Sequence, residues 1–106
     1  MMASFQPATY EERREPRLEV LFRARAIHPN GVERPVTIVN VSSGGFMARA
    51  DGDWAPGDQL SVTLPVVGVA RAEVRWSLGG RIGCQFVKAI DVPVFEEMLQ
   101  RMRRSI

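Results

Sequence analysis

Hydrophobic and polar residues alternate along much of the chain after residue 17, which is the pattern of strands with one buried face. The alternation is clearest over residues 69–76, where alanine, valine and tryptophan take turns with arginine and glutamate. Apolar side chains at every second position of a strand point to the same side of a sheet. The pattern therefore predicts a half-buried strand here, with Trp76 on its core side.

Six such segments occur, separated by short turn sequences. The turns are Asn30-Gly31, the run from Ser42 to Gly45, Pro56-Gly57-Asp58 and Leu78-Gly79-Gly80. Glycine, proline and asparagine at such points favour reversals of the chain. The connections leave no room for the long crossovers that parallel strands need. We expect six short antiparallel strands that close, or nearly close, into a small barrel.

The C-terminal segment has a different period. Its apolar residues recur at helical spacing and form one stripe. They are Phe95, Met98, Leu99 and Met102. Asp91 is a suitable N-cap, and arginines crowd the end of the segment. The pattern predicts one amphipathic helix over about residues 91–104, packed on the barrel or on a partner.

Residues 1–17 show no periodicity that would bury a face, and they end in a densely charged run. We interpret them as a flexible N-terminal arm and residues 18–106 as a single domain. The predicted fold class is thus mainly β, a six-stranded antiparallel barrel with one C-terminal helix.

Composition narrows the class of protein. A chain of 106 residues has room for one domain. No apolar run approaches the roughly 20 residues that span a bilayer, and the first residues do not form a secretory signal. Cys84 is the only cysteine, which excludes an intrachain disulfide and fits a reducing compartment. We expect a cytoplasmic protein without membrane insertion.

The formal net charge of +2 is too small to suggest that the chain wraps a nucleic acid polymer. Thirteen of the fourteen basic residues are arginine, and Lys88 is the only lysine. A GC-rich genome would give the same bias. Arginine nevertheless offers a planar fork that pairs with phosphate or a guanine edge and stacks on bases.

Two short segments carry candidate binding chemistry. Arg13, Arg14 and Arg17 cluster before the first predicted strand, and Pro16 disfavours a helix there. Asn40-Val41-Ser42-Ser43-Gly44-Gly45 combines amide and hydroxyl groups with glycines that allow a close approach. Taken separately, the first is also typical of a solvated terminus and the second of an ordinary hairpin loop.

Together, an Arg-x-x-x-Arg pair followed by Asp/Asn-x-Ser-x-x-Gly resembles the signature of the PilZ domain family. The matching residues are Arg13, Arg17, Asn40, Ser42 and Gly45. The Val74-Arg75-Trp76 and Gly83-Cys84-Gln85-Phe86 segments also look like the later part of such domains. The resemblance covers nearly the whole chain.

The resemblance implies a barrel that binds the bacterial second messenger cyclic di-GMP as a ligand, with no cofactor. In that family the arginines hold phosphates and one guanine, and the Asp/Asn-x-Ser-x-x-Gly turn reads the other. The implied ligand-binding residues are Arg13, Arg14, Arg17, Asn40, Ser42 and Gly45. The arginines would form a clamp, the asparagine and serine would read a base, and the glycine would permit close approach. We expect an effector protein as the further partner.

Two other functions fit a small barrel. One is a PilZ-like adaptor that contacts proteins without binding nucleotide. The other is a binder of single-stranded nucleic acid, which uses exposed aromatic residues between basic ones. The alternation places Trp76, Phe22 and Phe86 on apolar faces and leaves only Trp54 free to stack, so this function is disfavoured.

An enzyme is the least supported alternative. His28 is expected to be exposed in a hairpin, and no second histidine could complete a metal site or a proton relay. Cys84 alternates with core residues, and Asp51 and Asp53 flank a turn glycine. The sequence therefore predicts no catalytic or metal site.

Overall fold

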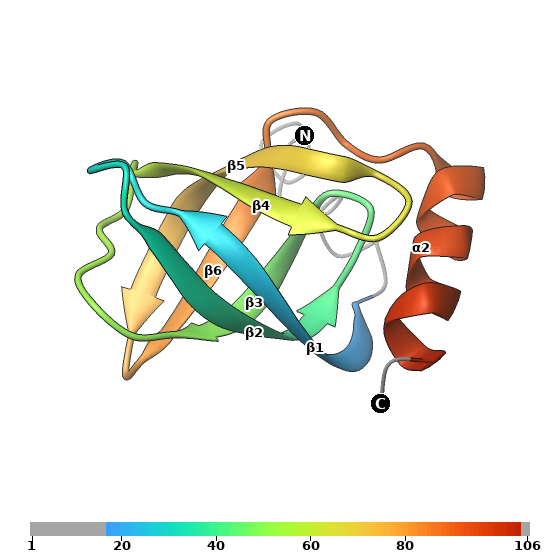
Figure 1. Cartoon of the computed structure of the whole chain (residues 1–106), viewed down its shortest axis with the longest axis horizontal. Coiled ribbons are helices and arrows are strands. Elements are labelled where there is room, and N and C mark those ends of the chain that lie inside the picture. The colour runs from blue at the N-terminus through green and yellow to red at the C-terminus, as the bar shows by residue number, and fades with distance from the viewer. Residues whose placement is uncertain (1–16, 105–106) are drawn as a thin grey trace, which may run out of the picture.

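The computed structural model describes residues 17–104, which form six strands and one helix (Figure 1). The elements are β1 (Leu18–Ile27), β2 (Glu33–Val41), β3 (Gly45–Ala50), β4 (Gln59–Leu64), β5 (Gly68–Leu78), β6 (Arg81–Phe86) and α2 (Val92–Arg104). The predicted flexible arm lies outside the described residues, except for Arg17. Within residues 17–104, no helix has the length and apolar character needed to cross a bilayer.

The strands form a closed barrel in the order β1-β2-β3-β6-β5-β4, and every pairing is antiparallel. Two register pairs, Ala26 with Val62 and Ile27 with Ser61, close the barrel between β1 and β4. Gly79 and Gly80 both have positive φ, as a two-residue hairpin turn between β5 and β6 requires. The six-stranded antiparallel barrel predicted from alternation and turns is confirmed.

The core contains the residues that alternate inward along the strands. Most are small or β-branched, which suits the narrow interior of a barrel with six strands. Larger side chains fill one region, where the rings of Phe46 and Phe86 lie 5.5 Å apart. Cys84 is buried in the same core, as predicted.

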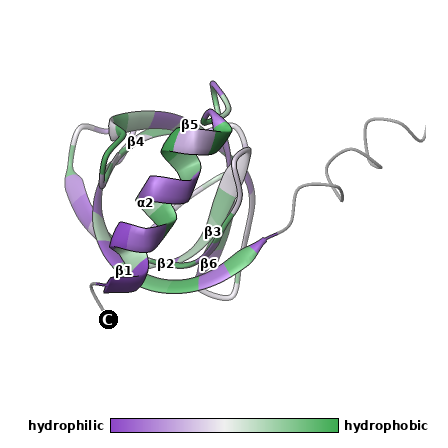
Figure 2. Cartoon of the chain, turned by 90° about the vertical axis from the view of Figure 1, so that its right-hand side faces the viewer, coloured by the Kyte–Doolittle hydropathy of each residue, from purple (hydrophilic) through white to green (hydrophobic). Residues whose placement is uncertain are grey.

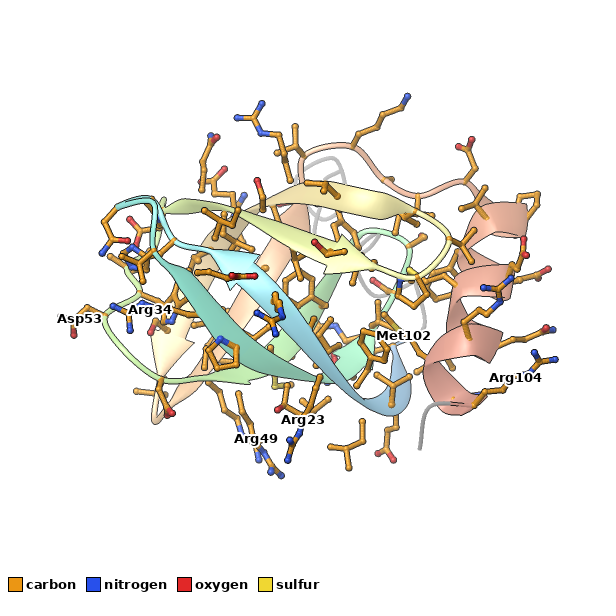
Figure 3. All side chains as sticks on the ribbon, viewed as in Figure 1. Arg23, Arg34, Arg49, Asp53, Met102 and Arg104 are labelled. Carbon is orange, nitrogen blue, oxygen red and sulfur yellow. The ribbon has the colours of Figure 1, made fainter. Side chains whose placement is uncertain are left out.

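α2 covers one end of the barrel (Figures 1 and 2). Met98 and Met102 are fully buried in the core, and Figure 3 shows Met102 pointing from α2 toward the barrel. Phe95 and Leu99 are half-buried against the same cluster. The guanidinium of Arg103 donates a hydrogen bond to the carbonyl of Glu19 on β1 at 3.3 Å. The predicted helix and its apolar stripe are thus present, and the stripe packs on the barrel.

A β-bulge changes the course of β5. Val74 pairs with Cys84, but Trp76 pairs with Gly83, so Arg75 is an extra residue in the strand. An extra residue reverses the inward and outward alternation beyond it. Trp76 therefore lies on the outer face with 38% of its surface exposed, and the prediction that it faces the core is wrong.

The loop between β3 and β4 buries Trp54, which is only 6% exposed. Its indole N–H donates to the carbonyl of Asp51 at 2.9 Å, and its ring centroid lies 4.6 Å from that of His28. The Nε2 atom of His28 is 2.7 Å from the carbonyl oxygen of Asp53. The expectation of a free Trp54 is wrong, because its ring is buried and packs against that of His28. His28, expected to be exposed, is half-buried.

Candidate functional site

The turn from Ser42 to Gly45 joins β2 to β3 and is closed by hydrogen bonds of its own serine. The backbone N–H of Ser42 donates to the carbonyl of Gly45 at 2.8 Å. The Ser42 hydroxyl accepts from the N–H of Gly44 at 3.2 Å and lies 3.5 Å from the Gly45 carbonyl. Ser42 is only 6% exposed. The structure thus gives it a turn-forming role, and reading a base stays a prediction.

The rest of the turn is tied to the last strand and to the segment that follows it. The carbonyl of Gly44 accepts from the N–H of Phe86 at 2.8 Å, and that of Ser43 accepts from Ile90 at 2.9 Å. Because both partners belong to the packed barrel or lead into α2, the turn is held from two sides. It can therefore present neighbouring side chains in a fixed position.

Gly45 is required by the close approach of two strands. It pairs with Gln85 on β6, and a Cβ atom at this position would collide with the backbone carbonyl of Cys84. A backbone neighbour cannot swing aside as a flexible side chain can. The motif glycine therefore has a structural reason of its own, and its predicted role in ligand approach is untested.

Asn40 lies near the end of β2, between Glu19 of β1 and Met47 of β3. The pairing is irregular on both sides of this position. Its side-chain Oδ1 is buried and has no hydrogen-bond partner among the described residues. A buried acceptor without a donor costs about 1–3 kcal/mol. Asn40 thus has an acceptor that no described residue uses.

The register between β1 and β2 brings the first motif to the second. Leu18 pairs with Val41 and Glu19 with Asn40, so Arg17 directly precedes the residue opposite Val41. Arg17 is exposed at this point. Arg13 and Arg14 lie outside the described residues, so their place in the site stays a prediction.

An outer row of residues extends from Asn40 across four strands. Asn40 pairs with Met47, Met47 with Gly83, and Gly83 with Trp76. Residues paired in this way point to the same side of a sheet. A Cβ at Gly83 would overlap the indole of Trp76, so the indole lies across this glycine. An exposed flat ring therefore shares one face with Asn40.

Sequence reasoning missed Trp76 as a site residue because it did not place the bulge at Arg75. Gly83 gave one signal, because a glycine inside a strand often marks a bulge or a close approach of another group. Arg75 itself is exposed and donates a hydrogen bond to Gln85, the pairing partner of Gly45, at 2.9 Å. The bulge thus adds a ring and a guanidinium beside the motif turn.

The possible metal ligands and the single thiol of the described residues bear on the expectation that the chain has no catalytic or metal site. Residues 17–104 contain no group of three or more histidine, cysteine or acidic side chains able to hold a metal ion. Burial raises the pKa of the Cys84 thiol to about 12, so it stays protonated at neutral pH and is a poor nucleophile.

The described part of the chain also contains a hollow of about 470 Å³ between the β4–β5 turn, residues 87–91 and the start of α2. Five of its eleven lining residues are valine, and it includes none of the candidate residues. The candidate residues therefore lie away from this hollow.

Comparison with known proteins points to one family. The family model for the PilZ domain matches residues 11–104. A solved structure of the PilZ domain with c-di-GMP of YcgR from Escherichia coli is similar, with 16% identity, a TM-score of 0.60, and coverage of 88% of this chain and 89% of that chain. The PilZ domain of CeSA from a cellulose-synthesizing bacterium is also similar, with 13% identity, a TM-score of 0.57, and coverage of 85% of this chain and 96% of that chain. No curated protein matched.

Proposed function

Because the chain belongs to the PilZ domain family, whose model matches residues 11–104, we propose that it is a non-catalytic receptor for cyclic di-GMP. The family and the fold predicted from the sequence are confirmed. The observation that carries the proposal is the β1–β2 register, which brings Arg17 beside the Asn40 to Gly45 turn. The similarity to the PilZ domain of YcgR, which was solved with c-di-GMP, supports the choice of ligand.

The chemistry of the outer row suits a guanine base. The amide N–H groups of Asn40 can donate to guanine O6 or N7, and its Oδ1, which is buried and unpaired, can accept from guanine once the side chain turns outward. The exposed indole of Trp76 gives a surface for stacking, which contributes about 1–3 kcal/mol per base. In this proposal Asn40 reads a base, and Trp76, three strand spacings away on the same face, offers a separate surface for stacking.

The arginines supply the complementary charge. Cyclic di-GMP carries two phosphates, and guanidinium forks match both phosphate oxygens and the O6/N7 edge of guanine. In this proposal Arg13 and Arg17 clamp the ligand and Arg14 adds a contact, while Ser42 and Gly45 shape the turn beneath it. Ligand binding would order the N-terminal arm, which an effector protein then recognises.

The ordering step has its own test. Hydrogen exchange should slow in residues 8–18 when cyclic di-GMP is added, because ordered backbone amides are protected from solvent. Equal protection with and without ligand would contradict this route of signalling. That result would not contradict the proposal that the chain binds cyclic di-GMP.

The receptor function is tested by calorimetric titration of the protein with cyclic di-GMP and, as a matched control, cyclic di-AMP. Adenine lacks O6 and the N2 amino group, so we expect clear binding of the guanine ligand and at least tenfold weaker binding of the adenine one. Flat heats with both ligands would favour the alternative, a PilZ-like adaptor that contacts proteins without binding nucleotide. Equal affinity for both would contradict base reading.

A further inference from the structure

Three arginines lie in register across the outer face of the barrel. Arg23 of β1 pairs with Thr37 of β2, Thr37 with Arg49 of β3, and Arg49 with Arg81 of β6. All three arginines are exposed, and Figure 3 shows Arg23 and Arg49 pointing away from the barrel on the same side. We call Arg23, Arg49 and Arg81 the arginine row.

The arginine row has no internal counter-charge. Within residues 17–104, none of its members forms an ion pair or a side-chain hydrogen bond, whereas the neighbouring Arg25 pairs with Glu33 at 3.4 Å. Arg49 and Arg81 are directly opposite each other on adjacent strands, an arrangement that destabilises a sheet when the charges are alike. The row therefore does not serve the stability of the barrel, and its charge is free for a partner.

Exposed leucines border the arginine row. Leu78 pairs with Arg81 and is 78% exposed, and Leu21, two residues before Arg23 on β1, is 52% exposed. Arginine is enriched at protein–protein interfaces, and the buried centre of such an interface is apolar. A surface for a nucleic acid polymer would instead need a longer basic track with several stacking rings. Among the described residues Trp76 is the only exposed large aromatic side chain, and the net charge of the whole chain is only +2.

We propose that the arginine row, with Leu21 and Leu78 at its margins, is a docking surface for an acidic, leucine-containing segment of a partner protein. Arg49 and Arg81 lie one strand spacing apart, about 4.8 Å, and Arg23 lies two spacings from Arg49. Carboxylates at similar intervals would pair with the guanidinium forks, and apolar side chains beyond them would cover the leucines. The partner is thus defined by its chemistry.

The arginine row runs beside the outer row of the candidate site. On β3, Arg49 is two residues from Met47, a distance of about 7 Å along a strand. A nucleotide on one row and a partner on the other would therefore be neighbours on one face. The inference rests on the proposed function in this respect, because it names the surface through which the receptor reaches its effector.

The test uses a short synthetic peptide of glutamate, aspartate and leucine, titrated into isotopically labelled protein and followed by NMR of the arginine side-chain N–H groups. The expected result is saturable shifts confined to Arg23, Arg49, Arg81 and their strand neighbours. The double variant Arg23→Glu/Arg49→Glu should raise the dissociation constant about tenfold or more, because like charges now face the peptide. The control Arg71→Glu/Arg104→Glu, which has the same change in net charge, should alter it less than about twofold.

Several results would overturn the proposal. One is that both double variants weaken binding of the acidic peptide equally. Another is that a peptide with glutamine and asparagine in place of the acids binds as tightly as the acidic one. A third is that oligothymidylate binds the same arginines more tightly than the acidic peptide does. Backbone spectra of each variant check that the barrel is folded. Cyclic di-GMP titrated into wild-type protein is a separate readout: peptide binding at the row without nucleotide binding would contradict the receptor function and support the docking surface.

Discussion

The indole of Trp76 on β5 lies across Gly83 on β6, in the space that a side chain at position 83 would fill. The bulge at Arg75 produces this contact, because it turns Trp76 from the core to the outer face. Through Met47, the same register leads to the unpaired Oδ1 of Asn40. An exposed ring and the Asn40 amide thus lie on one face of the barrel.

Replacing Trp76 tests whether this ring belongs to the site. Trp76→Ala should weaken cyclic di-GMP binding about tenfold or more, because base stacking contributes about 1–3 kcal/mol. Trp76→Phe keeps a flat ring and should retain most of the affinity. Calorimetric titration measures both, with unfolding curves as a check on the fold. Unchanged affinity in Trp76→Ala would remove the ring from the site.

The position of Trp76 also shows where prediction from the sequence ended. Alternation and turn residues predicted all six strands and the helix, because those signals are local. A bulge depends on how two strands pair, and this pairing is not visible in the β5 sequence alone. The strict alternation assumed for residues 69–76 therefore gave the wrong face to Trp76.

The same limit applies to the candidate site and to the loops. The motif positions of Asn40 and Ser42 could be read directly from the sequence, but the buried, unpaired state of the Asn40 oxygen depends on its strand neighbours. The buried Trp54 ring contacts His28, which is far away in the sequence and packs against it at an interplanar angle of 57°. Contacts of this kind arise only after the barrel closes.

Gly45→Ala should destabilise the fold itself. The added Cβ would collide with the backbone carbonyl of Cys84, and relief requires the strands to move apart. We expect a loss of about 1–3 kcal/mol in the free energy of unfolding, measured by urea denaturation. The control Ser43→Ala in the same turn should change it by less than about 0.5 kcal/mol. Wild-type stability in Gly45→Ala would contradict the structural role of this glycine.

Cys84 should make stability depend on alkaline pH. Burial raises the pKa of its thiol from 9.0 to about 12 in the folded protein. Because the folded pKa is the higher one, the folded state holds the proton more tightly. The stabilisation is fully present below about pH 9 and is lost as pH rises toward about 12.

Urea unfolding at several pH values checks this dependence. Between about pH 9 and 12, the unfolding free energy of wild-type protein should fall more steeply than that of Cys84→Ala, by up to about 1.4 kcal/mol per pH unit. Cys84→Ala is the matched reference, since its other titrating groups are the same. Parallel pH profiles for the two proteins would show that the thiol does not titrate in this way.

The central claim is that Arg17 and the Asn40 to Gly45 turn form one cyclic di-GMP site, and a titration of wild-type protein and Arg17→Ala tests it most directly. Each good bidentate contact of an arginine with guanine contributes about 1–3 kcal/mol, so Arg17→Ala should bind at least about tenfold more weakly. The control Arg25→Ala, on the same strand but paired with Glu33, should bind like wild-type protein. Equal affinity of Arg17→Ala and wild-type protein for cyclic di-GMP would contradict the site.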